Sequence, residues 1–173
     1  MLQQLTIEEF LKELAARKPT PGGGSVAALS GALAAGLVSM AAEFSGNKDV
    51  SGQARTLMNT LTDLVDRDAK AFASRNLREA TRVPLETAKH SYAVLKLAGA
   101  LLETCNPKVI TDIGVAAKMA ESALKGAMLN VEVNLVSIRD EAFKQEVLKE
   151  AEEFSSPDSL AKMIVSNIEA RLR

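Results

Sequence analysis

The sequence predicts an all-α protein, an up-and-down helical bundle of five to seven helices that forms a single domain over residues 1–173. The composition favours this fold, because 27 Ala and 22 Leu stand against five Phe, one Tyr and no Trp. Ala and Leu are strong helix formers, whereas strands prefer β-branched and aromatic residues. No segment alternates between apolar and polar residues for long, and a chain of 173 residues that is 47% apolar can bury one core.

Local signals place each helix. Thr6 and Glu9 form a capping box that opens a first helix ending near Arg17. The run K-P-T-P-G-G-G-S at 18–25 contains two prolines and three glycines and indicates an irregular segment. Pro84 is expected in the first turn of the fourth helix. The further helices are predicted at about 25–44, 52–76, 83–105, 111–138 and 139–154, and from the Ser156-Pro157-Asp158 start signal to the C-terminus.

Charge and cysteine content exclude several classes of protein. A net charge of −1 lacks the basic footprint of a general nucleic-acid binder, and base-stacking modules need more aromatic residues. A single cysteine, Cys105, forms no internal disulfide, which favours a reducing compartment. The N-terminus carries Glu8, Glu9 and Glu13, unlike a secretory signal. We therefore expect a cytoplasmic protein.

The predicted second helix carries almost no charge, which raises the question of a membrane span. Residues 26–42 are apolar or small. Most of them are Ala, Gly and Ser, which contribute little free energy of transfer into a bilayer, and no aromatic or basic anchors flank the run. A buried helix is the better interpretation, and no membrane association is expected. Gly31 and Gly36 indicate that another backbone approaches this helix closely. Such a helix fits the centre of the bundle or a symmetric subunit contact.

Asp68 is the first candidate for chemistry. Apolar residues recur at helical spacing on one face of the third helix, and Asp68 falls inside that stripe, whereas Asp63, Asp66 and Lys70 point away from it. The stripe comprises Leu57, Leu61, Leu64, Val65 and Phe72. A carboxylate that faces a core is costly to ionise, so its pKa should rise, which suits a proton donor or base near neutral pH. A structural carboxylate that caps a neighbouring helix or pairs with an Arg is the alternative.

Polar groups at two further places are candidate ligand contacts. The loop Gly22-Gly23-Gly24-Ser25 follows no strand, so it is no dinucleotide fingerprint. It leads into a helix N-terminus, which can bind an anion or polar ligand, or it is a tight turn with Ser25 as the N-cap. On the fifth helix, Asp112, Asn130 and Asn134 lie along the edge of an apolar face, where they either bind a ligand or join neighbouring helices. That face comprises Ile113, Ala116, Ala117, Ala120, Leu124, Ala127, Val131, Leu135 and Ile138.

The sequence gives little support for a metal site or for a catalytic nucleophile. His90 and Cys105 would stand about 22 Å apart on one helix, and no spacing of His, Cys and carboxylates is typical of a metal site. We therefore expect no metal, a surface position for His90 and a packing role for Cys105. Between Arg67 and Lys89, six basic residues face three acidic ones. This excess could contact an anionic substrate tail or form a solvated helix face.

Several motifs together resemble a known family. The chain reads P-T-P-G-G-G-S-V-A-A-L at 19–29, V-D-R-D-A-K-A-F at 65–72, V-P-L at 83–85, T-D-I-G-V-A-A-K at 111–118 and N-V-E-V-N at 130–134. In this order they closely resemble the cyclodeaminase/cyclohydrolase family, which includes the C-terminal domain of formimidoyltransferase-cyclodeaminase and stand-alone methenyltetrahydrofolate cyclohydrolases. The resemblance covers nearly the whole chain.

The resemblance implies a homodimeric helical bundle that acts on tetrahydrofolate derivatives, with no metal and no cofactor beyond the folate substrate. It implies a folate-binding cleft near the dimer interface, with Asp68 as the catalytic carboxylate. The other matching motif positions are candidate substrate contacts: Arg17, Gly22, Gly23, Gly24, Ser25, Asp112, Asn130 and Asn134. The chain departs from the family after Phe72, where members carry an additional segment with an acidic position. Here ten residues separate Phe72 from Val83, and Leu77 stands near the position of that acid.

The leading hypothesis is hydrolysis of 5,10-methenyltetrahydrofolate to 10-formyltetrahydrofolate, with Asp68 as general acid and base. The close alternative is cyclodeamination of 5-formiminotetrahydrofolate, in which Asp68 would protonate the departing ammonia. A third alternative is a non-catalytic folate-binding or structural dimer that keeps the fold without the segment after Phe72.

Overall fold

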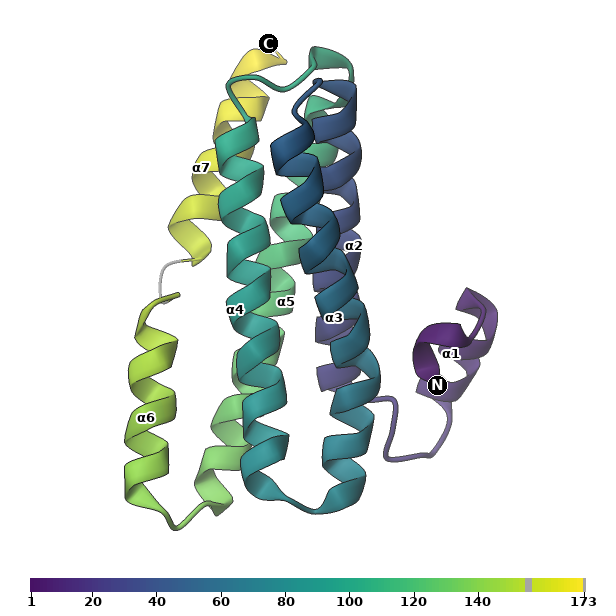
Figure 1. Cartoon of the computed structure of the whole chain (residues 1–173), viewed down its shortest axis with the longest axis vertical. Helices are drawn as coiled ribbons and strands as arrows, with labels where there is room; N and C mark the ends of the chain where they lie inside the picture. Colours follow the sequence, from purple (N-terminus) through teal and green to yellow (C-terminus); the bar gives the residue numbers. More distant parts are fainter. Residues whose placement is uncertain (155–156, 173) are drawn as a thin grey trace.

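A computed structural model of the chain, which describes residues 1–154 and 157–172, confirms the all-α prediction (Figure 1). No strand occurs in these residues. The α-helices are α1 (Ile7–Ala15), α2 (Gly23–Phe44), α3 (Lys48–Ser74), α4 (Leu77–Leu101), α5 (Ile110–Ser137), α6 (Glu141–Glu152) and α7 (Pro157–Arg171). Two short 3₁₀ helices, η1 (Leu2–Gln4) and η2 (Pro107–Val109), precede α1 and α5. Ser156 and the C-terminal residue, which belong to the predicted last helix, lie outside the described residues.

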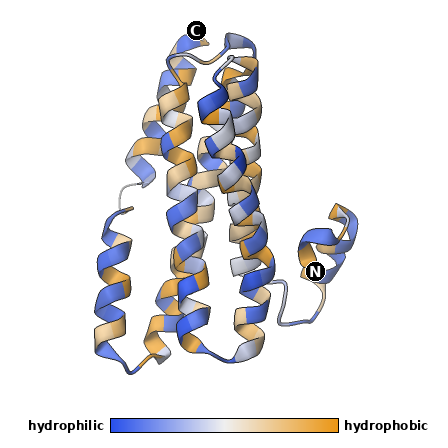
Figure 2. Cartoon of the chain, in the orientation of Figure 1, coloured by the Kyte–Doolittle hydropathy of each residue, from blue (hydrophilic) through white to orange (hydrophobic). Residues whose placement is uncertain are grey.

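The four long helices α2 to α5 form the up-and-down bundle (Figure 1). α2 packs against α3 and α5, and α4 packs against the same two helices from the other side. α7 lies against α5 and α4, while the largely hydrophilic α6 lies beside α4 (Figure 2). The apolar face predicted for α5 is buried along its full length, from Ile113 to Ile138. Helical periodicity alone therefore identified the core side of this helix.

α2 is packed by small residues, as its sequence indicates. Ala28, Ala34 and Ala35 are fully buried. A Cβ atom on Gly31 would lie 2.7 Å from Oγ of Ser91 and 3.1 Å from a methyl of Leu61, so this glycine is required for close packing against α3 and α4. The nearest groups are side chains, so the prediction that another backbone approaches this helix is wrong. Among the described residues, α2 is the one helix long and apolar enough to cross a membrane, and 61% of that stretch is buried within the bundle.

Three helix starts differ from the prediction, because the sequence pattern did not show which residues cap them. α2 begins at Gly23 with Gly22 as N-cap, so the glycines and Ser25 belong to its first turn and Ser25 is not the cap. α4 begins at Leu77 instead of Val83, because the Asn76 side chain accepts hydrogen bonds from the Arg78 and Glu79 amides. The third helix likewise begins at Lys48, earlier than predicted, with Asn47 as its cap.

Three side chains occupy other environments than predicted. Phe72, expected in the core, is 58% exposed, because the apolar stripe of α3 leaves the bundle in its last two turns. Asp66, expected in solvent, is only 5% exposed. The N-terminal η1 helix folds over α3, and the Leu2 amide donates to Oδ1 of Asp66 at 2.5 Å. His90 is partly buried instead of lying at the surface.

Candidate active site

A cleft of about 240 Å³ lies where the start of α2 meets α3 and the C-terminal half of α5. Its wall brings together most of the residues that the sequence singled out, although they come from three different helices. The lining residues are Pro19, Thr20, Gly22, Gly23, Gly24, Asp68, Phe72, Ala80, Asn130, Val133 and Asn134. The structure thus places the glycine loop, the candidate carboxylate and both asparagines around one space.

Asp68 is held by the first turn of α2. The Ser25 hydroxyl, which is fully buried, donates to Oδ2 of Asp68 at 2.7 Å, and the Ser25 main-chain amide also hydrogen-bonds the carboxylate. Asp68 therefore takes the place of a local N-cap, because no side chain of Gly22 is available for this purpose. The alternative prediction, in which Asp68 caps a neighbouring helix, is therefore confirmed.

The environment of Asp68 also favours proton transfer. Burial raises the pKa of the Asp68 carboxyl above its ordinary value of 3.8, and this effect exceeds the opposing hydrogen bonds from the Ser25 hydroxyl and amide. The group combines a cleft position with a raised pKa, which is the combination expected of a general acid or base. Capping and catalysis are compatible roles here, because the carboxylate has a second oxygen beyond the one that Ser25 binds.

Gly24 is required for this arrangement. A Cβ atom at this position would overlap with Oδ1 and Cγ of Asp68, so only glycine lets the carboxylate reach the helix end. A Cβ on Gly23 would have only ordinary contacts with the Asn130 side chain. Gly24, the last residue of the glycine run, is therefore explained by the approach of Asp68 rather than by a turn conformation.

The two asparagines have their amide nitrogens on main-chain carbonyls. Nδ2 of Asn130 donates to the Gly126 carbonyl at 2.8 Å, and Nδ2 of Asn134 donates to the Ala80 carbonyl at 2.7 Å. A carbonyl only accepts, so these bonds fix which end of each amide remains for other partners. Oδ1 of each side chain accepts no hydrogen bond from the residues that the structure describes, and Asn134 also joins α5 to α4.

Two predicted substrate contacts lie elsewhere in the single chain. Arg17 is exposed in the connection between α1 and α2 and does not line the cleft. Asp112 lies in the first turn of α5, eighteen residues before Asn130, and a helix rise of 1.5 Å per residue puts about 27 Å between them. The apolar periodicity of α5 showed which edge these residues share, but not that the helix is too long for them to meet.

A second hollow of about 560 Å³ continues the cleft outward and shares Pro19, Thr20, Phe72, Ala80 and Asn134 with it. We call the two spaces the inner and the outer hollow. The outer hollow is also lined by Arg75 and Leu77, neither of which was predicted as a contact residue. In the sequence, the one indication of these two residues was that the family pattern breaks after Phe72, because this break lies at the rim of the outer hollow.

Most of the local basic excess is neutralised. Arg67 pairs with Glu86 and Glu79, Arg82 with Glu146 and Glu150, and Lys89 with Glu150. Arg78 pairs with Asp140. These pairs are largely solvent-exposed, which supports the interpretation of a solvated helix face for four of the six residues. Lys70 and Arg75 form no ion pair in the described part of the chain.

A metal centre has no basis in the observed side chains. Within residues 1–154 and 157–172, no group of three or more His, Cys, Asp or Glu lies close enough together to hold a metal ion. The cleft offers one carboxylate, two amides and main-chain groups of a helix N-terminus. This set suits hydrogen bonding and proton transfer to an organic ligand.

The fold and site therefore define a helical-bundle protein with a carboxylate cleft at a helix N-terminus. The sequence profile of the formiminotransferase-cyclodeaminase family matches residues 6–75 and 73–153. The chain belongs to this family. The two matched stretches meet at residues 73–75, which is where the chain departs from the family pattern.

Individual relatives agree with this assignment. The chain is 37% identical to a methenyltetrahydrofolate cyclohydrolase of Methylorubrum extorquens, over 85% of this chain and 87% of that protein. It is 29% identical to the formimidoyltransferase-cyclodeaminase of Rattus norvegicus over 98% of this chain, which spans 38% of the rat protein. A crystal structure of formiminotetrahydrofolate cyclodeaminase from Thermotoga maritima superposes with a TM-score of 0.90 at 27% identity, covering 100% of both chains.

Proposed function

We propose that this protein is a folate one-carbon enzyme that hydrolyses 5,10-methenyltetrahydrofolate to 10-formyltetrahydrofolate. The observation that carries the proposal is Asp68, which lines the inner hollow, has a raised pKa and is positioned by Ser25. The similarity to the Methylorubrum cyclohydrolase over most of both chains supports the choice of reaction.

The chemistry requires one group that accepts and returns a proton. Water adds to the methenyl carbon while Asp68 takes a proton from it, which gives a neutral carbinolamine. The bond between that carbon and N5 then breaks as Asp68 returns the proton to N5. The hydroxyl proton of the carbinolamine leaves as the formyl carbonyl forms. A carboxyl whose pKa is raised by burial suits both transfers.

A second candidate reaction is supported by the Thermotoga cyclodeaminase, whose fold this chain shares over its full length. In that reaction N10 of 5-formiminotetrahydrofolate attacks the formimino carbon, and the bond to the amino nitrogen breaks. Asp68 would protonate the departing ammonia. The same carboxyl therefore serves both reactions, and the substrate decides between them.

Assays of the purified protein with both substrates, followed by the absorbance of the methenyl group, test this proposal. We expect turnover of the methenyl compound and a loss of about 100-fold in Asp68→Asn, because a positioned acid or base contributes on this scale. Asp63→Asn is the matched control, since Asp63 is exposed on the same helix. A loss of less than tenfold in Asp68→Asn contradicts the proposed role.

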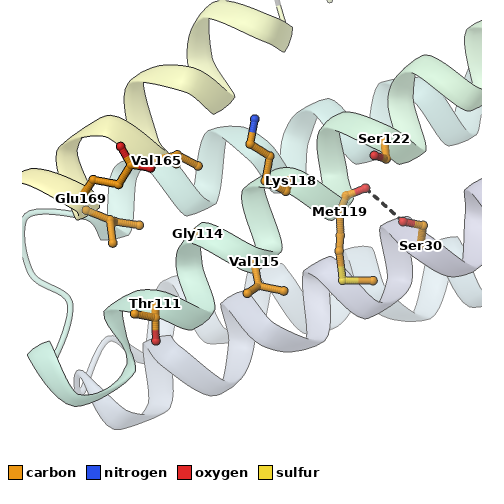
Figure 3. A pocket seen from close by; sticks show the side chains of 10 residues that line it. Ser30, Thr111, Gly114, Val115, Lys118, Met119, Ser122, Val165 and Glu169 are labelled. Atoms are coloured by element: carbon orange, nitrogen blue, oxygen red, sulfur yellow. Dashed lines mark hydrogen bonds between the residues drawn. The ribbon is translucent and has the colours of Figure 1, made fainter. Parts of the chain in front are cut away.

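We further propose that the chain forms a homodimer through the outward face of α2. Leu33 and Phe44 on α2 are 52% and 62% exposed, and Val115 of α5 continues this apolar surface. Two apolar hollows flank it, one of about 500 Å³ between α2 and α3 and one of about 480 Å³ between α5 and α7 (Figure 3). Exposed apolar side chains gathered on one face in this way are typical of an interface.

A second copy of the chain is the occupant that this surface fits. α2 carries one charged residue, Glu43, close to its C-terminal end, so an isologous contact would bury no opposed charges along it. The surface also reaches the cleft, because exposed Val26 follows Ser25 directly and exposed Val133 lines the inner hollow. A partner on this face would border the reaction site.

A further inference from the structure

Asp68 and Phe72 of α3, and Arg75 directly after this helix, line the cleft one after another. Asp68 and Phe72 are four residues apart and share one face of α3, and Arg75 caps the helix three residues later. Asp68 and Phe72 line the inner hollow, and Phe72 and Arg75 line the outer one. Asp68 and Arg75 are two turns apart, or about 10.5 Å along the helix axis. The row thus runs from a carboxylate through an aromatic ring to a guanidinium.

Phe72 is unusual in its position. It is one of five Phe in the chain, and it is 58% exposed although it lies at the junction of two hollows. An accessible ring that forms the wall of a cleft offers a flat surface on which an aromatic ligand group can stack. Packing within the chain does not use this ring, so a ligand is its natural partner.

Arg75 differs from the neighbouring basic residues. It is the C-cap of α3, with a φ of 56°, and this left-handed backbone turns the chain at the rim of the outer hollow. Four of the six basic residues between Arg67 and Lys89 pair with carboxylates, whereas Arg75 forms no ion pair within the described residues. Lys70 is the other basic residue of this stretch without an ion pair among the described residues, and it lines a different hollow beneath the N-terminal segment. A free guanidinium binds a carboxylate through two parallel hydrogen bonds.

We propose that Arg75 recognises the glutamate carboxylates of the substrate and that Phe72 stacks on its aminobenzoyl ring, so that the one-carbon unit is aligned at Asp68. This inference rests on the proposed function. A tetrahydrofolate carries its reacting carbon, its aminobenzoyl ring and its glutamate in this order, and the three side chains follow the same order from the inner to the outer hollow. Arg75 lies where the two stretches that match the family profile meet, at residues 73–75.

Calorimetric titration with two ligands tests the assignment. The first is 5-formyltetrahydrofolate, and the second is 5-formyltetrahydropteroate, which has the same rings without the glutamate. We expect Arg75→Gln to weaken binding of the first about fivefold to tenfold and to leave binding of the second unchanged. Arg75→Lys should recover part of the loss. Phe72→Leu should weaken both ligands by the same factor, because both carry the aminobenzoyl ring.

Lys70→Gln is the matched control, since it removes the same charge from the same helix outside the cleft. The assignment of Arg75 is overturned if Arg75→Gln and Lys70→Gln change the affinity for 5-formyltetrahydrofolate by the same factor. It is also overturned if Arg75→Gln weakens the binding of both ligands equally. Turnover by the wild type together with unaltered binding in Arg75→Gln refutes this inference alone. A wild type that neither binds nor converts either folate refutes the proposed function and this inference with it. Thermal unfolding shows whether each variant is folded.

Discussion

The Asn134 side chain on α5 donates a hydrogen bond to the Ala80 carbonyl on α4, at 2.7 Å. That carbonyl is available because Pro84, four residues later in α4, has no amide hydrogen to donate to it. Pro84 therefore lies inside the helix rather than in its first turn, and the group that it leaves without a helical partner is satisfied from another helix. The V-P-L and N-V-E-V-N motifs, 45 residues or more apart in the sequence, meet at this one carbonyl.

The connection between Pro84 and Asn134 predicts a coupling between their substitutions. Asn134→Ala should cost about 1 kcal/mol of unfolding free energy, because it leaves the Ala80 carbonyl without a donor. In a Pro84→Ala background the helix itself supplies a donor, so the same substitution should cost less. A double-mutant cycle by urea denaturation measures the difference. Additive effects of the two substitutions would show that they act independently.

Gly24→Ala should displace Asp68, because the added methyl group overlaps with the carboxylate. We expect a loss of about 1–3 kcal/mol in unfolding free energy, as for overpacked sites, together with a loss of catalytic activity. Gly52→Ala is the control. A Cβ at this exposed helical position meets nothing, so the substitution should stabilise the protein by about 0.5–1 kcal/mol. Unaltered activity in Gly24→Ala would contradict the tight fit.

The pKa of Asp68 predicts how stability depends on pH. Because the folded-state pKa lies above the unfolded value, the contribution of Asp68 to stability is complete below the ordinary pKa of 3.8 and is lost as pH rises through the folded pKa. Asp68→Asn should therefore unfold at a higher temperature than the wild type at neutral pH, and the gap should close toward pH 3. Calorimetric melting curves over this pH range decide the matter.

Ser25→Ala should move the pH profile of the reaction. The Ser25 hydroxyl lowers the pKa of Asp68 against the effect of burial, so its removal should raise that pKa further. If Asp68 acts as the base, the ascending limb of kcat/KM against pH shifts to higher pH in this variant. Ser30 lies on α2, like Ser25, and its hydroxyl donates to the Met119 carbonyl on α5 (Figure 3). Ser30→Ala should therefore leave the ascending limb in place.

Leu33→Glu should convert the proposed dimer to a monomer, because it places a charge at the centre of the apolar face of α2. Sedimentation velocity measures the change in mass. Leu148→Glu introduces the same charge at an exposed site on α6 and should leave the dimer intact. A wild type that sediments as a monomer at micromolar concentration would refute this assembly.

Much of the fold follows from local patterns. The capping box at Thr6 and Glu9, the Ala-rich second helix and the buried face of α5 were all predicted and are all confirmed. These features depend on residues within one or two helical turns, where spacing alone fixes which side chains share a face. Asp68 was singled out in the same way, by its place in an apolar stripe.

The positions that the sequence misjudged depend on contacts between distant segments. The start of α2 is set by Asp68 from α3, the burial of Asp66 by the N-terminal segment, and the exposure of Phe72 by where the bundle ends. Arg17 and Asp112 belong to the predicted contacts and lie away from the cleft in the single chain, so their role as substrate contacts stays a prediction.

The sequence by itself determined the helical class, the core faces, the family motifs and the choice of Asp68. Only the tertiary structure decided what Asp68 contacts, which ends of Asn130 and Asn134 remain available, and that Phe72 and Arg75 extend the cleft. The physical reason is the range of the interactions. Helix propensity and periodicity act over a few residues of one segment, whereas burial, hydrogen-bond partners and the pKa of a carboxyl depend on groups that only the folded chain brings together.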